Sequence, residues 1–178
     1  MVRRRAVKTQ TPITHGWLVE HGPRLVLLAR QWVDCHADAE DVLQAALLRF
    51  WKHRDSARDP VAYLYRTLRT TAMNHRRSAT RRRHHENQAT MEPRRGEALF
   101  EDPAAKAEVT ELSERITLAL QSLPIEQREV VVMRTWGHLS FDAIGDAVGV
   151  PPRTAQSRYR YGIESMRRFV ETATGVTP

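Results

Sequence analysis

Cysteine is almost absent from this chain of 178 residues, because Cys35 is the single one. One cysteine excludes an intrachain disulfide and any zinc or iron–sulfur site built on several thiolates. The chain also has no apolar run near the roughly 20 residues that a membrane-spanning helix needs. Residues 1–10 are basic without an apolar core, so we expect no secretory signal, no membrane contact and a cytoplasmic protein.

Residues suited to catalysis or metal binding are also scarce. His84, His85 and Glu86 are adjacent, so on a helix their side chains point apart, and no further ligand group accompanies them. Cys35 beside His36 stands at an expected helix start, where a lone thiol is more often inert than nucleophilic. No Gly-rich phosphate-binding loop is present. The sequence therefore predicts a protein that is not an enzyme and has no metal and no cofactor.

Arginine, by contrast, is abundant and unevenly distributed. The net charge is +7, and residues 54–85 alone contribute +7 from nine arginines and two aspartates. Residues 86–129 sum to −5, and residues 151–178 to +3. Arginine suits bidentate phosphate contacts and stacking on bases. A single basic run is often only solvated surface, but two such runs separated by an acidic one indicate two nucleic-acid contacts on two modules.

Apolar periodicity predicts an all-α fold without strands. Gly22-Pro23 is expected to break or restart the first helix, and Asp38 is expected to be the N-cap of the second. Asp59 is expected to cap the third helix, with Pro60 in its first turn. Gly162 costs about 1 kcal/mol relative to alanine inside a helix, so we expect it to mark the useful end of the last one. The expected helices span 17–33, 37–53, 60–83, 103–123, 125–136, 141–148 and 151–170.

Composition divides the chain into two helical modules. Periodicity is lost after residue 84, where Pro93 and Gly96 interrupt a polar stretch that we interpret as a linker. Asp102-Pro103 is a favourable start for the next helix. The expected parts are a basic arm (1–15), a helical domain (16–84), a linker (85–102), a four-helix domain (103–172) and a tail (173–178).

Residues 140–161 have the pattern of a helix-turn-helix. Ser140 can cap a short helix, and Gly149 suits a turn that needs a positive φ. The following helix is amphipathic, and its polar side fits base edges and phosphates in a major groove. A surface helix of a bundle is the alternative. The candidate duplex contacts are Arg153, Thr154, Gln156, Ser157, Arg158 and Arg160.

The basic helix expected over residues 61–83 combines aromatic and arginine side chains. Tyr65 and Arg66 open this stretch, and aromatic rings can stack on unpaired bases while arginines neutralise phosphates. The alternative is that the tyrosines belong to the core. The pattern favours a contact with single-stranded nucleic acid.

Three blocks in order resemble the bacterial RNA polymerase sigma factors of the extracytoplasmic-function (ECF) type, within the sigma-70 family. They read ADAEDVLQAALLRFW (37–51), YLYRTLRTTAMNHRR (63–77) and SLPIEQREVVVMRTWGHLSFDAIGDAVGVPPRTAQSRYRY (122–161). The resemblance covers about residues 20–170. It implies a protein that directs RNA polymerase core to promoters, melts the −10 element and reads the −35 element.

The resemblance also implies a role for each block. The first would bind the clamp helices of the largest polymerase subunit through Asp38, Glu40, Asp41, Gln44 and Leu48. The second would capture the −10 element through Arg69, Thr70, Asn74, Arg76 and Arg77, and the helix 153–161 would read the −35 element. The implied partners are core polymerase, including its flap, promoter DNA and, as often in this family, an anti-sigma factor. The protein is expected to be a monomer.

Four positions depart from the family pattern. Thr70 stands where the family usually has Asn, and Ala45 replaces a common Glu. Gln156 replaces a frequent Lys or Arg, and Arg153 a frequent Gly. These changes bear on promoter preference and on the polymerase face.

Two other classes of protein stay open at this point. A stand-alone helix-turn-helix regulator would bind duplex DNA unaided, usually as a dimer. An interaction protein or enzyme with a basic face would need a pocket of converging titratable groups.

Overall fold

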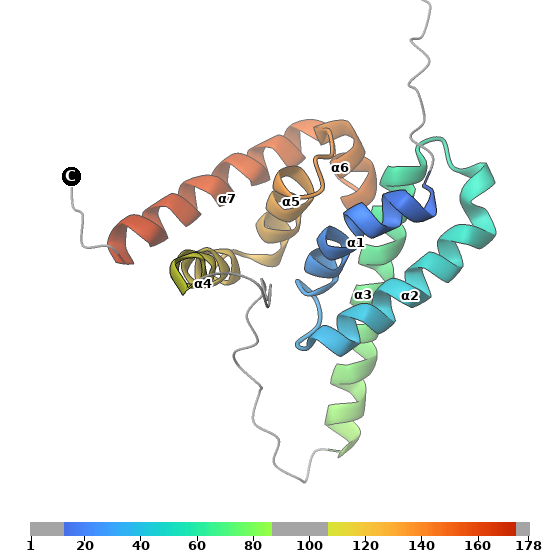
Figure 1. Cartoon of the computed structure of the whole chain (residues 1–178), viewed down its shortest axis with the longest axis horizontal. Coiled ribbons are helices and arrows are strands. Elements are labelled where there is room, and N and C mark those ends of the chain that lie inside the picture. Colours follow the sequence, from blue (N-terminus) through green and yellow to red (C-terminus); the bar gives the residue numbers. More distant parts are fainter. Residues whose placement is uncertain (1–12, 87–106, 174–178) are drawn as a thin grey trace, which may run out of the picture.

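The structure, a computed structural model, describes residues 13–86 and 107–173. Every regular element in these ranges is helical, which confirms the expected all-α fold (Figure 1). None of the described helices is both long and apolar enough to cross a bilayer. The helix start expected at Asp102-Pro103 lies outside the described residues, as do most of the basic arm and the linker. The elements are α1 (His15–Ala29), α2 (His36–His53), η1 (Arg54–Ser56), α3 (Pro60–Glu86), α4 (Ala107–Gln121), α5 (Ile125–Thr135), α6 (Phe141–Val148) and α7 (Pro152–Ala173).

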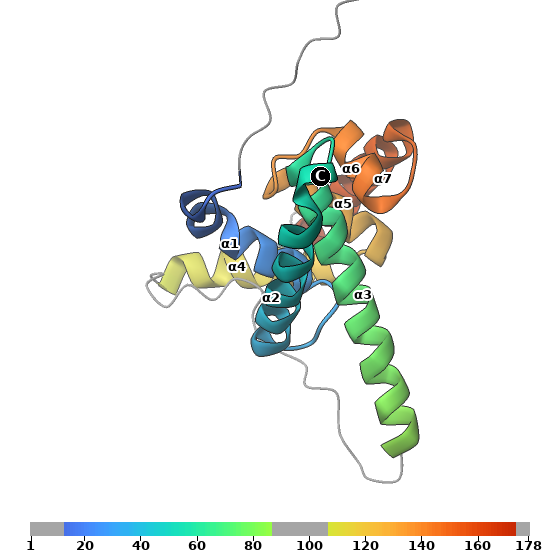
Figure 2. The same cartoon turned by 90° about the vertical axis from the view of Figure 1, so that its right-hand side faces the viewer.

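The N-terminal module consists of α1, α2 and α3. α2 packs along α3, and α1 lies against both. The apolar faces of the three helices meet in a core that includes Leu28, Phe50, Leu64 and Leu68, each at most 1% exposed. Figure 2 shows the C-terminal half of α3 extending beyond the other helices, which leaves most of its circumference open.

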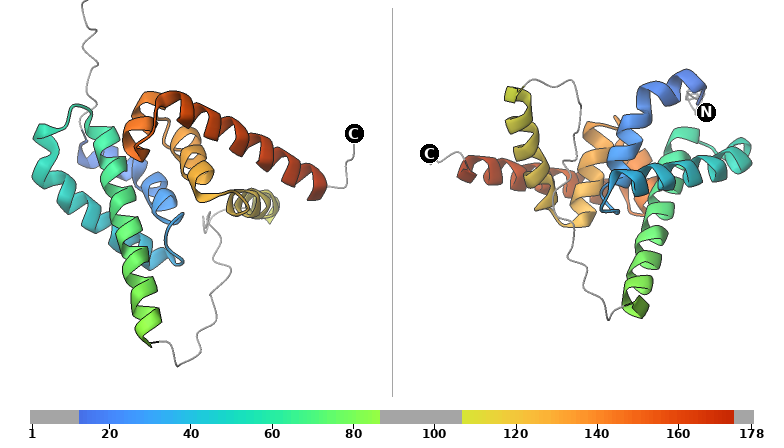
Figure 3. Two further views of the ribbon diagram at one scale, coloured as in Figure 1. Left: turned by 180° about the vertical axis from the view of Figure 1, so that it is seen from behind. Right: turned by 60° about the horizontal axis from the view of Figure 1, so that its bottom comes forward.

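The C-terminal module is built around α7, which packs against α4, α5 and α6. Leu120, Met133, Ile144 and Ala155 are fully buried in it. Figure 3 shows α6 beside the start of α7 and α4 near its far end. The short helix, the turn and the start of α7 therefore form the expected helix-turn-helix.

The break expected at Gly22-Pro23 is absent, because α1 runs through Pro23 to Ala29. A proline inside a helix leaves the carbonyl four residues earlier without its amide partner. Here that carbonyl belongs to Val19, which is 67% exposed, so water can satisfy it. The prediction failed because an unpaired carbonyl costs little where the helix is open to solvent.

The N-caps agree with the sequence patterns at α3 and α6 but not at α2. The carboxylate of Asp59 accepts a hydrogen bond from the amide of Ala62 at 3.0 Å. The hydroxyl of Ser140 accepts one from the amide of Ala143 at 3.2 Å. At α2, however, Cys35 is the N-cap, and its Sγ accepts a bond from the amide of Asp38 at 3.3 Å. Asp38 instead lies in the first turn, where its negative charge interacts favourably with the helix dipole.

The last helix continues through Gly162, as its expected span of 151–170 required, and ends at Ala173. A Cβ at Gly162 would lie 2.7 Å from Cγ2 of Val131, a stiff and buried side chain. Glycine is therefore required by the close packing of α7 on α5.

We expect Gly162→Ala to lower the free energy of unfolding by about 1 kcal/mol, because overpacking outweighs the gain in helix propensity. Gly22→Ala is the matched control: its Cβ would meet no atom within 4 Å. That variant should gain about 0.5–1 kcal/mol. Urea unfolding followed by circular dichroism measures both changes. A stabilised Gly162→Ala protein would contradict the packing argument.

Candidate polymerase and nucleic-acid interface

The polymerase-facing candidates lie along the outer face of α2. Ala39, Val42, Ala46 and Phe50 turn inward and are buried, so the opposite face is left in solvent. The helical period places Asp41, Gln44 and Leu48 together on that face. All three are exposed, and Leu48 is 66% exposed.

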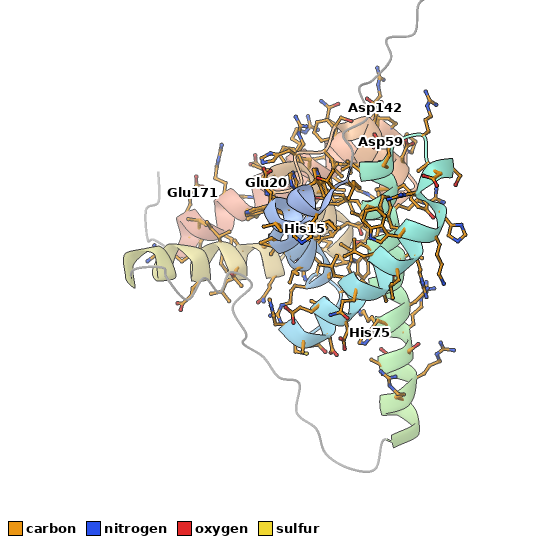
Figure 4. The ribbon with its side chains drawn as sticks, turned by 45° about the vertical axis from the view of Figure 1, so that its right-hand side comes forward. His15, Glu20, Asp59, His75, Asp142 and Glu171 are labelled. Atoms are coloured by element: carbon orange, nitrogen blue, oxygen red, sulfur yellow. The ribbon has the colours of Figure 1, made fainter. Side chains whose placement is uncertain are left out.

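Asp38 and Glu40 have neighbours within the protein. Asp38 Oδ1 lies 3.9 Å from Nε2 of His75 on α3, and Glu40 Oε1 lies 3.4 Å from Nε2 of His36. Figure 4 shows His75 on α3 beside the start of α2. The two acids are thus held at the N-terminal end of the α2 face.

Trp51 extends the α2 face and was not among the predicted site residues. It is 37% exposed, and the guanidinium of Arg54 lies 4.6 Å from its ring centroid. Trp51 follows Leu48 by three residues, so the helical period alone could have placed it on the same face. We define the α2 strip as Asp41, Gln44, Leu48 and Trp51.

The basic face of α3 is formed by residues at helical spacing. Arg66, Thr70, Asn74 and Arg77 are all exposed and fall on one side of the helix, which we call the α3 strip. The hydroxyl of Thr70 donates to the carbonyl of Arg66 at 2.9 Å. Residues 60–85 contain no acidic residue, so nothing on α3 within this range offsets the positive charge of the strip. The strip can therefore neutralise phosphates along its length.

A groove runs beside the strip on the C-terminal half of α3, with a volume of about 650 Å³. Arg76, also predicted, is exposed and lines it together with Asn74, Arg77 and Arg81. The indole of Trp32, from the turn between α1 and α2, forms part of its wall. No pattern within the α3 sequence could have indicated Trp32, since it comes from another segment.

Tyr65 was predicted to contact DNA, and the structure contradicts this. Its side chain is 1% exposed, and burial raises the pKa of its hydroxyl to about 12, against a small opposing effect of Arg24. With the two modules in this arrangement the ring is enclosed, partly by Gly137 of the other module, and is not available to stack on a base. The spacing of Tyr65 from Leu68 and Ala72, both fully buried, is that of a core face and could have shown this.

Arg69 is the other α3 candidate that is not free. Its Nε lies 2.6 Å from Oε2 of Glu129, and its Nη2 lies 3.1 Å from Oε1. Glu129 belongs to α5, in the other module. The guanidinium also lies 5.6 Å from the ring centroid of Trp32.

The helix-turn-helix presents its second helix to solvent. Gly149 has φ of 76°, as the turn requires, and a Cβ at Gly145 would lie 2.7 Å from the carbonyl oxygen of Val150. Two glycines thus allow the close turn between α6 and α7. Ala155 is fully buried, and Tyr159 packs edge-on against Phe141 at 5.7 Å between ring centroids. These contacts fix the rotation of α7 about its own axis.

That rotation decides which predicted residues are available. Most of the candidate duplex contacts are exposed on the first turns of α7, namely Arg153, Thr154, Gln156, Ser157 and Arg160. Arg158 is half-buried instead, and its charge acts on Glu129. The guanidinium of Arg160 lies 5.1 Å from the ring centroid of Tyr161. The face formed by the exposed five can enter a major groove.

In the described parts of the chain, no three metal-binding side chains come together. Cys35 acts as a helix cap, as described above.

Comparison with known proteins agrees with this arrangement. Residues 18–82 match the family described as Sigma-70 region 2, and residues 113–165 match Sigma-70, region 4. The chain is 30% identical over 164 residues to the ECF RNA polymerase sigma factor SigL of Mycobacterium tuberculosis, covering 89% of this chain and 88% of SigL. It is 29% identical over 155 residues to the RNA polymerase sigma factor CarQ of Myxococcus xanthus, covering 84% of each.

The fold is also that of a solved sigma factor. The co-crystal structure of RpoE with the anti-sigma factor NepR from Bartonella quintana matches with a TM-score of 0.69 and 20% identity. The match covers 86% of this chain and 94% of RpoE. Both family regions, the relatives matched over 84–88% of their length and the fold agree, and the chain therefore belongs to the sigma-70 family, within its ECF group.

Proposed function

We propose that this sigma factor divides promoter recognition between the α3 strip and the first turns of α7. The α3 strip and Arg69 capture the non-template strand of the −10 element, and the exposed residues of α7 read the −35 element in duplex form. This proposal is supported by two exposed, arginine-bearing helix faces, one on each module. The face on α3 also lies in a stretch, residues 60–85, that contains no acidic residue.

The single-stranded contact supplies the energy for melting. Flipping a base out of the stack costs a few kcal/mol. Arginine contacts to phosphates and stacking on the exposed bases are made fully only with the opened strand, so they offset that cost. Strand opening is thus driven by binding energy alone, and no catalytic group is needed.

The polymerase contact is assigned to the α2 strip. Asp41 offers carboxylate oxygens and Gln44 an amide, which suit an arginine-bearing helix of the largest subunit. Leu48 and Trp51 add apolar area next to them, as at the centre of many interfaces. The flap is assigned to the groove of about 470 Å³ on the C-terminal module, which Ser122 and Phe169 line.

We further propose a monomer that works in the cytoplasm, where its polymerase acts. RpoE, which shares the fold, was solved with an anti-sigma factor. An analogous partner here would compete for the same surfaces.

A gel-shift assay separates this function from that of a stand-alone regulator. Purified protein, core polymerase and their mixture are each incubated with a duplex library of random sequence, and the bound DNA is sequenced. We expect enrichment of a two-part motif only in the mixture. Enrichment of a palindromic site by the isolated protein would support the stand-alone regulator instead.

A further inference from the structure

One ion pair joins the two modules at the DNA-binding face. Arg69 donates two parallel hydrogen bonds, at 2.6 and 3.1 Å, to the two carboxylate oxygens of Glu129. The side chain of Glu129 is 0% exposed and that of Arg69 is 19% exposed. Such a bidentate geometry is among the strongest of hydrogen-bonded pairs. While this pair exists, the bidentate edge of the Arg69 guanidinium is occupied by Glu129 and is not available to a phosphate or a base.

The surfaces around the pair also meet. α3 packs against α6, and α1 against α5. The predicted −10 contacts Arg66, Arg69 and Thr70 share a groove of about 560 Å³ with the helix-turn-helix turn, residues 145–151. In Figure 4, Asp59 at the start of α3 and Asp142 at the start of α6 lie at the same end of the molecule. The turn that orients the −35 helix thus stands over part of the −10 surface.

Tight packing continues beside the pair at Gly137, just after α5. A Cβ there would lie 2.9 Å from the hydroxyl oxygen of Tyr65. That hydroxyl is buried and has no hydrogen-bond partner among the described residues. The contact between the modules is therefore close-packed in its apolar part.

The contact between the modules includes both an attractive and a repulsive pair of charges. Burial raises the pKa of the Glu129 carboxyl, and the bonds from Arg69 and the charge of Arg158 work against that rise. Across the same contact, burial and then the charge of Arg76 lower the pKa of Arg128. The attraction is concentrated in Arg69 and Glu129, while the charges of Arg76 and Arg128 repel each other across the contact. Removing the pair should therefore tip the balance toward separation of the modules.

We propose that the free protein is closed by the Arg69–Glu129 pair, with its −10 surface partly covered by its own helix-turn-helix module. Arg69 then reaches DNA only after the modules separate. The interaction surface is thus intramolecular, and its partner is the α5–α6 side of the same chain. The consequence for DNA rests on the proposed −10 role of Arg69, whereas the closure itself does not.

The test measures the distance between the modules in the full chain. Spin labels are placed at Asp55→Cys and Glu164→Cys, both exposed positions, in a Cys35→Ser background that keeps an N-cap acceptor. Double electron–electron resonance is recorded for the parent and for Glu129→Gln, Arg69→Met and Glu126→Gln. Glu126 is an exposed acid of the same helix whose charge raises the pKa of Glu129, so its removal should not weaken the pair, and it serves as the matched control.

We expect a short, narrow distance distribution in the parent and in Glu126→Gln. Glu129→Gln and Arg69→Met should both give longer and broader distributions, with helix content by circular dichroism unchanged. If both variants keep the parent distribution, the pair does not close the protein. If one variant loses helix content, the other decides the result.

A second readout connects the closure with DNA. Binding of a short fluorescein-labelled oligo(dT) is measured by anisotropy without polymerase. Glu129→Gln should bind the oligo(dT) about tenfold more tightly than the parent, because the form with separated modules is then no longer a minor part of the population. Separated modules without tighter binding would confirm the closure and contradict the −10 role of Arg69. Tighter binding without separation would overturn the closure.

Discussion

Replacing Asp41 and Gln44 together by alanine is expected to weaken binding to core polymerase by at least about a hundredfold. Each residue offers a hydrogen bond to a charged partner, and such bonds contribute about 1.5–3 kcal/mol each. Both side chains are exposed on the α2 strip and contribute nothing to the core. The loss should therefore appear in affinity without a change in stability.

Surface plasmon resonance with immobilised core polymerase measures this loss, and thermal unfolding checks the fold. The control variant carries Glu20→Ala and Gln121→Ala, which remove the same two chemical groups from exposed positions of α1 and α4. It should bind core like the parent. An affinity of the Asp41 and Gln44 variant within threefold of the parent would remove the α2 strip from the polymerase interface.

Replacing Arg153 and Gln156 together by alanine is expected to weaken −35 recognition by the polymerase complex about a hundredfold. Good base contacts discriminate by about 1–3 kcal/mol each. Both residues are exposed on the first two turns of α7, whose rotation is fixed by Ala155 and Tyr159. Arg158 is a poorer choice for this test, because its charge also acts on buried Glu129.

Anisotropy of a labelled duplex that carries the −35 element, titrated with the protein–core complex at several salt concentrations, measures the effect. A phosphate contact would reduce the salt slope by about one, whereas a base contact would relax sequence preference and leave the slope nearly unchanged. The control is Arg167→Ala, an exposed arginine farther along α7. If the control loses as much affinity as the Arg153 and Gln156 variant, the first turns of α7 have no special role.

Local patterns in the sequence predicted most of the fold. Asp59 and Ser140 cap their helices as expected, and Gly149 has the positive φ that the turn requires. The α2 helix has its expected buried and exposed faces. These features depend on residues within a few positions of one another, so a local sequence pattern can predict them.

Two features that the sequence did not indicate come from contacts that are distant in sequence. Gly162 was expected only to cost helix stability, but glycine is required there by Val131 on another helix. The −10 role of Arg69 stays a prediction, but its pairing with Glu129, 60 residues away, could not be anticipated from the sequence. Tyr65 differs, because its spacing within α3 already indicated the core. The aromatic and arginine content of that helix outweighed the periodicity in the prediction.

Run-off transcription with purified core polymerase on a library of randomised promoters tests the central claim most directly. We expect transcripts only when the protein is present, from templates that share one −10 and one −35 motif at a fixed spacing. Arg153→Ala with Gln156→Ala should change the selected −35 motif and leave the −10 motif as it is. No protein-dependent transcript, or transcripts without a shared two-part motif, would contradict the account.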